Sequence, residues 1–310
     1  MPRGASMAPP LGPEDDLREA IIALVEGASF ELSARDPLAG EGLRELAPPG
    51  STAYIALAAS DTHHGIVAAA SRLKRAGFAP VPHIAARTLA SFTQLNDYLA
   101  RMAGEAGIDR ALVIAGDIER PVGPFATSLE LLNTGLFEKH GIRRIDIAGY
   151  PEGHPRVSRV HLEEALAAKC RTMRERGLEP GVLTQFGFEV APIVAWLKAL
   201  RLAGMEVPVR IGLAGPASIA TLAKFAVRCG IGNSLRALTG GHASFARLLI
   251  EADPAALVAA LAGAAQDRAL GIAGLHFFTF GGVRRTTDWL AKVRCGAFDG
   301  MASGGFLVHG

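Results

Sequence analysis

This sequence contains few cysteines and no long apolar run. Its 3 cysteines, Cys170, Cys229 and Cys295, are far apart, so they show neither the spacing of a zinc site nor the even number of a disulfide framework. No segment approaches the roughly 18 consecutive apolar residues that a membrane-spanning helix needs. We therefore expect a cytoplasmic protein with no bound metal and no membrane partner.

An excess of charge of one sign is also lacking. The chain has 32 basic and 30 acidic side chains, a formal net charge of +2, and the two signs are interspersed. Such a surface has no electrostatic footprint for nucleic acid. The expected partner is a small-molecule substrate, and a homo-oligomer is compatible with the sequence.

Apolar strands and helical segments alternate along the chain. Of the 310 residues, 49% are hydrophobic, which is enough for one large core. The segments expected to be strands are 28–32, 53–59, 79–85, 111–115, 145–149, 182–186, 207–213 and 272–280. A helix is expected after each strand except the last, and this alternation is typical of a (β/α)8 barrel, the TIM barrel. No Gly-x-Gly-x-x-Gly turn follows the first strand, which disfavours an open doubly wound sheet.

The barrel is expected to occupy residues 15–310 as one catalytic domain. Residues 1–14 are expected to be a disordered leader. An additional N-terminal helix at 17–26 precedes the first strand, and one helix is expected over 125–139. A helical insertion from Asn233 to Ile250, followed by a helix over 254–270, comes before the last strand.

Polar residues follow the predicted strands, most clearly after the fifth. Ile145 and Ile147 have the period of a strand, and the Gly and Pro residues after them predict a rigid turn that presents Tyr150, Glu152 and His154. The active sites of such barrels lie at the carboxyl ends of the strands. The polar residues expected at this rim are Glu31, His83, Arg87, Asp117, Tyr150, His154, Gln185, Ser218, His276 and Thr279.

The rim motifs resemble, in order and spacing, those of the methylenetetrahydrofolate reductase family. The most specific are Tyr-Pro-Glu-Gly-His-Pro at 150–155 and Thr-Gln-Phe at 184–186. Ser-Phe-Glu at 29–31, Pro-His at 82–83, Ala-Gly-Asp at 115–117 and His-Phe-Phe-Thr at 276–279 accompany them. The resemblance covers roughly residues 29–279.

The resemblance implies an oxidoreductase that interconverts 5,10-methylenetetrahydrofolate and 5-methyltetrahydrofolate. Hydride would come from NADH or NADPH through FAD. Glu31 matches the family's general acid, which helps to open the imidazolidine ring of the folate, and a carboxylic acid of raised pKa suits that task. Asp117 matches an aspartate near both flavin and pterin, and Gln185 matches an amide that binds the folate.

The resemblance also implies the binding residues. For FAD these are His83, Gly116, Asp117, Tyr150, His154 and Lys169, and for the folate they are Gln185, Phe188 and Arg284. The family's arginine before Gly-Asp is replaced by Ala115. The family's phosphate-binding series is poorly kept, and Lys169 and Arg171 are the nearest basic side chains.

Two other functions are compatible with the same residues. One is a metal-dependent barrel lyase or hydrolase that would use side chains such as His63, His64, His83, His154 or Asp117 as ligands. However, no His-x-His or His-x-x-x-His spacing occurs. The other is a barrel that binds folate or flavin without catalysis. Loss of activity with a chelator would indicate the first, and tight folate binding without turnover the second.

Overall fold

The chain forms a closed barrel of eight parallel strands. A computed structural model describes residues 13–58, 61–229, 251–300 and 305–309. The barrel strands in chain order are β1 (Ser29–Ser33), β2 (Thr52–Ala56), β3 (Ala79–Ala85), β4 (Arg110–Ile114), β5 (Arg144–Gly149), β6 (Glu179–Gly187), β7 (Val209–Ala214) and β10 (Ile272–Phe278). Each strand pairs with its neighbours in this series, and β10 closes the barrel against β1. This confirms the predicted (β/α)8 barrel.

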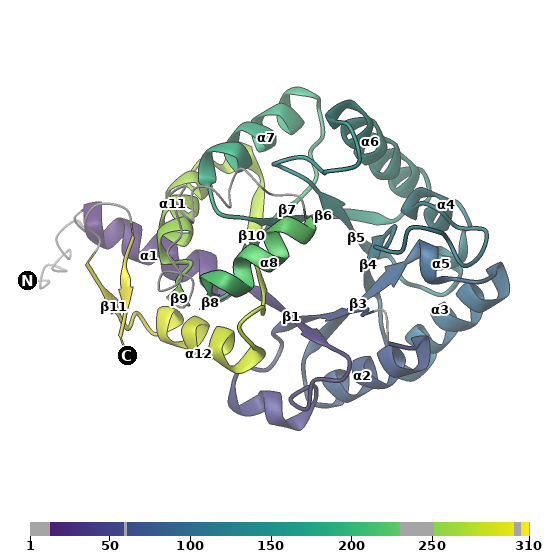
Figure 1. The fold of residues 1–310 in the computed structure, drawn as a ribbon, viewed down its shortest axis with the longest axis horizontal. Helices are drawn as coiled ribbons and strands as arrows, with labels where there is room; N and C mark the ends of the chain where they lie inside the picture. Colours follow the sequence, from purple (N-terminus) through teal and green to yellow (C-terminus); the bar gives the residue numbers. More distant parts are fainter. Residues whose placement is uncertain (1–12, 59–60, 230–250, 301–304, 310) are drawn as a thin grey trace, which may run out of the picture.

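Helices surround the barrel (Figure 1). They are α1 (Pro13–Glu26), α2 (His63–Arg75), α3 (Phe92–Ala106), α4 (Ser128–Leu132), α5 (Leu136–Lys139), α6 (Arg159–Glu175), α7 (Val190–Leu202), α8 (Ile219–Cys229), α11 (Ala255–Ala265) and α12 (Val283–Arg294). The N-terminal helix α1 packs against α11 and α12 on the outer side. Among the described residues, none of the helices is long and apolar enough to cross a membrane.

The alternation of side chains along each strand divides the core in two. Outward-facing side chains such as Phe30, Leu32 and Ile55 are fully or almost fully buried in one large cluster with the helices. Inward-facing Tyr54 and Leu112 belong to a small separate cluster. Because successive side chains of a strand point to opposite faces, the polar residues in the inward register are held inside the barrel.

Several predicted elements differ from the structure. The single helix expected over 125–139 is two short helices, α4 and α5, because Gly135 between them has a left-handed φ of 72°. No α-helix follows β1, where only a 3-10 turn at Glu41–Glu45 is found, whereas α12 does follow the last strand. The helix predicted over 254–270 is shorter in the structure: α11 ends at Ala265, and a 3-10 turn follows at Arg268–Leu270.

The chain's predicted leader and insertion lie mostly outside the described residues. The first described helix begins at Pro13, one residue before the expected end of the leader. The predicted insertion from Asn233 to Ile250 falls within the undescribed residues 230–250. Two short antiparallel pairs accompany the barrel: β8 (Ala217–Ser218) with β9 (Glu251–Ala252), and β11 (Phe298–Asp299) with β12 (Leu307–Val308).

Candidate active site

A carboxyl group and an imidazole meet at the mouth of the barrel. Glu31 is the third residue of β1, and His83 is the fifth residue of β3. Nε2 of His83 lies 3.4 Å from Oε2 of Glu31, and the side chains are only 10% and 18% exposed, respectively. Thr279, just after β10, donates a hydrogen bond from its hydroxyl to the main-chain carbonyl of Glu31 at 2.8 Å. The structure thus brings together two of the predicted site residues and fixes the strand that carries the acid.

Burial changes the proton affinity of both groups. It raises the pKa of Glu31 from 4.5 to about 7 and lowers the pKa of His83 from 6.5 to about 4. Although their separation is within the range of an ion pair, both groups are therefore predominantly neutral just below pH 7, with one proton on the carboxyl. A carboxyl with a pKa near 7 is suited to act as an acid at neutral pH.

The loops after β4 and β5 place Asp117, Tyr150 and His154 near one another. The Tyr150 and His154 rings make an edge-to-face contact with centroids 5.3 Å apart. Burial, and then Arg156, lower the pKa of His154, while the negative charge of Asp117 opposes them. Asp117 itself is exposed. The turn after β5 therefore brings His154 near Asp117 of the β4 loop.

Gly116 and Arg87 determine the path of the β4 loop. Gly116 has a φ of 93°, and a Cβ there would lie 3.1 Å from the Cβ of Ala85 at the end of β3. Arg87 donates from Nε to the carbonyl of Ala126 at 2.9 Å and from Nη1 to that of Ile118 at 3.2 Å. Arg87, predicted to lie at the rim, is therefore an anchor for the loop that carries Asp117.

Gln185 and Phe188 lie on the side of the mouth formed by β6. Gln185, half-buried, borders the same shallow depression as Glu152. A Cβ at Gly187 would lie 2.8 Å from Oε1 of Glu152, so the absence of a side chain there makes room for that carboxyl. Phe188 contacts Phe186 edge to face, with ring centroids 5.7 Å apart.

Phe186 and Phe188 belong to an aromatic cluster at the ends of β6 and β10. Its members are Phe186, Phe188, Phe225, Phe278 and Phe280. The Phe225 and Phe280 rings stack with centroids 4.1 Å apart. All of these rings except that of Phe186 are half-buried. The side of the mouth formed by β6 and β10 is therefore apolar and aromatic.

Two of the predicted binding residues, Lys169 and Arg284, belong to the helices α6 and α12. Lys169 is in the third turn of α6, half-buried, and burial lowers its pKa. Arg284 lies exposed in the first turn of α12 and lines a cleft of about 750 Å³ together with Pro216, Asp288 and Lys292.

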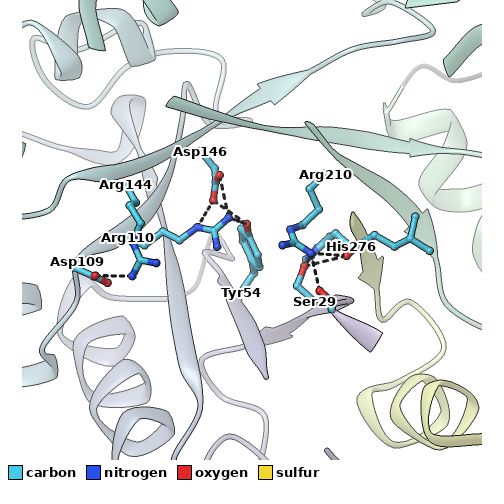
Figure 2. Close-up of polar contacts among 10 residues, drawn as sticks. Ser29, Tyr54, Asp109, Arg110, Arg144, Asp146, Arg210 and His276 are labelled. Atoms are coloured by element: carbon cyan, nitrogen blue, oxygen red, sulfur yellow. Dashed lines mark hydrogen bonds and ion pairs between the residues drawn. The ribbon is translucent and has the colours of Figure 1, made fainter. Parts of the chain in front are cut away.

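Below the Glu31 and His83 pair, the barrel interior contains a polar network. Of its members only His276 was predicted, and it was expected at the rim, whereas it is fully buried. Asp146 of β5, 5% exposed, accepts a hydrogen bond from the Tyr54 hydroxyl at 2.8 Å and two from Arg110, at 2.8 and 3.1 Å (Figure 2). Burial, and then the Asp146 charge, raise the pKa of Tyr54. The Tyr54 hydroxyl points to this network, so it is occupied away from the mouth.

A second part of the interior network joins β1, β7 and β10. Nδ1 of His276 lies 3.0 Å from the Ser29 hydroxyl, and Nη1 of Arg210 donates to the carbonyls of Gly27 and Leu275 at 2.9 and 3.1 Å. Figure 2 shows both parts side by side in the interior. Nε2 of His276 is buried and has no hydrogen-bond partner among the described residues. Burial, and then His83, hold the pKa of His276 well below its usual range.

A sequence signal for this network existed. Tyr54 and Asp146 each stand in the inward register of a strand, between apolar residues that face the helices, and Arg110 is the first residue of β4. The part of the chain that the structure describes contains no group of three His, Cys, Asp or Glu residues that could hold a metal ion. No protein-family model matches the chain.

Proposed function

We propose that this protein is an oxidoreductase that interconverts 5,10-methylenetetrahydrofolate and 5-methyltetrahydrofolate, with Glu31 as the general acid. The observation that carries the proposal is the buried Glu31 carboxyl, whose pKa of about 7 keeps a proton available at neutral pH. The resemblance of the rim motifs to the methylenetetrahydrofolate reductases supplies the substrate class. A cytoplasmic location and NADH or NADPH as the reductant belong to the same proposal.

The chain's role in this chemistry is to deliver a proton to a ring nitrogen. The Glu31 carboxylic acid gives its proton to a nitrogen of the imidazolidine ring as the bond between that nitrogen and the methylene carbon breaks. The electron pair of the bond stays on the nitrogen, and the carbon becomes an electrophilic iminium. The step leaves a carboxylate on Glu31 and a positive charge on the iminium, so the two charges that it creates are opposite in sign and lie in the same site.

Side chains around the mouth are suited to holding the folate. Gln185 offers both a donor and an acceptor, and Asp117 offers a carboxylate that can accept hydrogen bonds from a pterin amino group and ring nitrogen. Phe188 belongs to the half-buried aromatic cluster, whose flat faces suit a stacked ring. Arg284 would take the carboxylates at the far end of the substrate, from the cleft beside α12.

The residues present fit FAD at the β4 and β5 loops. Gly116 turns the β4 loop with its positive φ, and Tyr150 and His154 form an edge-to-face pair whose imidazole feels the charge of Asp117. Lys169 is half-buried on α6, where burial lowers its pKa and the neighbouring Cys170 opposes this, and its ammonium is suited to an anionic group. When bound, FAD supplies the carrier of hydride between the nicotinamide and the folate carbon.

The proposal is tested by anaerobic turnover. The purified protein is mixed with NADH or NADPH and 5,10-methylenetetrahydrofolate, with and without added FAD, and 5-methyltetrahydrofolate is quantified by chromatography. We expect product that depends on FAD, and about 100-fold less product from Glu31→Gln, in keeping with the loss of a general acid. Absence of product from the wild-type protein with either nucleotide, while FAD binds, would contradict the proposal.

A further inference from the structure

A buried imidazole nitrogen lies beside the Glu31 carboxyl. Nε2 of His83 is buried, and it makes no hydrogen bond of good geometry with any described residue. It nevertheless lies 3.4 Å from the Glu31 carboxyl. Buried polar atoms are almost always paired, so an orphaned imidazole nitrogen beside a carboxylic acid calls for a physical account.

We propose that His83 is a positioning residue for Glu31: its Nε2 accepts the carboxylic proton, and the two side chains hold one proton between them at the mouth of the barrel. This inference rests on the proposed function only for its consequence in catalysis. The hydrogen bond itself depends on the two side chains alone. A small rotation of the carboxyl completes it, and such bonds often tighten when substrate binds.

The surroundings favour one shared proton over an ion pair. The ionisable groups facing the two side chains from neighbouring strands are Tyr54 of β2, whose ring centroid is 6.2 Å from that of His83, and His276 of β10. Both are neutral, because burial disfavours their charged forms. The neighbour of His83 on β4 is the apolar Leu112. Within the described part of the chain, burial is the cause of both pKa shifts, and burial favours the neutral acid and base over a carboxylate and an imidazolium.

The bond would select which oxygen of Glu31 carries the proton. An acid whose proton is held on the oxygen facing His83 has a defined direction, and the other oxygen remains free to contact the substrate. Reaction then requires the Glu31 carboxyl to turn its proton from Nε2 of His83 to the substrate nitrogen, so the geometry of His83 affects the rate without its touching the folate. His83 was predicted from the resemblance to contact FAD, and the role proposed here is compatible with such a contact.

Infrared difference spectroscopy of the full-length protein tests the pair directly. At pH 6 the wild-type spectrum should contain the C=O band of a protonated, buried carboxyl that is missing in Glu31→Gln. The band should disappear with a midpoint near pH 7, in line with the pKa of about 7. A wild-type spectrum at pH 6 without this band would overturn the proposal, whatever the variants do.

Two amide variants then test the part played by His83. Glutamine places its amide where Nε2 of the imidazole lies, whereas asparagine is too short to reach Glu31. We expect His83→Gln to keep the carboxyl band at its wild-type position and His83→Asn to move it. The matched control is His276→Asn, a second buried imidazole with no described contact to Glu31, which should leave the band in place.

Turnover provides a second readout. Product formation should fall about fivefold in His83→Asn, the usual effect of one lost hydrogen bond, and recover to within about twofold of wild type in His83→Gln. Equal carboxyl bands in both His83 variants and wild type would show that His83 is not the partner. If the bands behave as expected but no folate product forms, the pair stands and the proposed reaction is wrong. If folate product forms but the carboxyl bands do not behave as expected, the proposed reaction stands and the proposed pair is refuted.

Discussion

Replacing Glu31 by Gln should change how the stability of the protein depends on pH. The folded protein binds the Glu31 proton more tightly than the unfolded chain, because the pKa is about 7 in the fold and 4.5 ordinarily. The free energy of unfolding therefore falls as the pH rises from about 4.5 to about 7. At 1.36 kcal/mol per pH unit, the difference corresponds to about 3 kcal/mol.

His83 has the opposite effect over nearly the same range. Its pKa is about 4 in the folded protein and 6.5 ordinarily, so the unfolded chain binds its proton more tightly. The free energy of unfolding therefore rises by about 3 kcal/mol between pH 4 and pH 6.5. In the wild-type protein the two contributions nearly cancel. Glu31→Gln removes the contribution that falls with rising pH. The free energy of unfolding of the variant, relative to that of wild type, should therefore rise by about 3 kcal/mol from pH 4 to pH 7.5.

Urea denaturation at several pH values between 4 and 8 measures this difference. The comparison between variant and wild type removes the contribution of every other titrating group. The mirror experiment is His83→Gln, whose stability relative to wild type should fall over the same range. Parallel curves for wild type and Glu31→Gln would refute the reasoning, because they would mean that Glu31 titrates alike in the folded and unfolded states.

Two further predictions concern the scaffold of the site. Gly116→Ala should destabilise the fold by about 2 kcal/mol, since it combines a positive φ with a 3.1 Å contact. The control is Gly141→Ala: Gly141 has a φ of 74°, but a Cβ there would meet nothing within 4 Å, so this variant should lose only about 1 kcal/mol. If thermal melts show the same loss of stability for both variants, the contact with Ala85 has no effect. Asp146→Ala should cost about 3–5 kcal/mol, because it leaves a buried guanidinium and a tyrosine hydroxyl without their acceptor. Its control is Asp109→Ala, in a surface pair whose carboxylate is 60% exposed, where chemical denaturation should show a loss below about 1 kcal/mol.

The sequence predicted the barrel because its strands carry local signals. The predicted segment 79–85 coincides with β3, since a compact apolar run is bounded by glycine on one side and a polar turn on the other. The break at Gly135 was missed because a single left-handed residue interrupts an otherwise helical pattern. Local patterns locate elements well, but they do not reveal where one residue changes the chain direction.

The polar contacts inside the barrel could not be predicted from the sequence for a different reason. Tyr54 and Asp146 lie 92 residues apart and meet only because the barrel closes. Glu31 and His83 were both expected at strand ends, yet their contact depends on the stagger between strands, which periodicity does not encode. The roles of Lys169 and Arg284 stay predictions, since the structure places them on the helices α6 and α12.

The central claim is that Glu31 donates a proton in folate chemistry, and the most direct test separates that chemistry from reaction with the nicotinamide nucleotide. Wild type and Glu31→Gln, both loaded with FAD, are compared for 5-methyltetrahydrofolate formation and for NADH or NADPH oxidation with an artificial quinone acceptor. We predict that the variant keeps oxidation with the quinone and loses at least about 100-fold in folate product. Equal folate product from the two proteins would contradict the assignment of Glu31 as the acid.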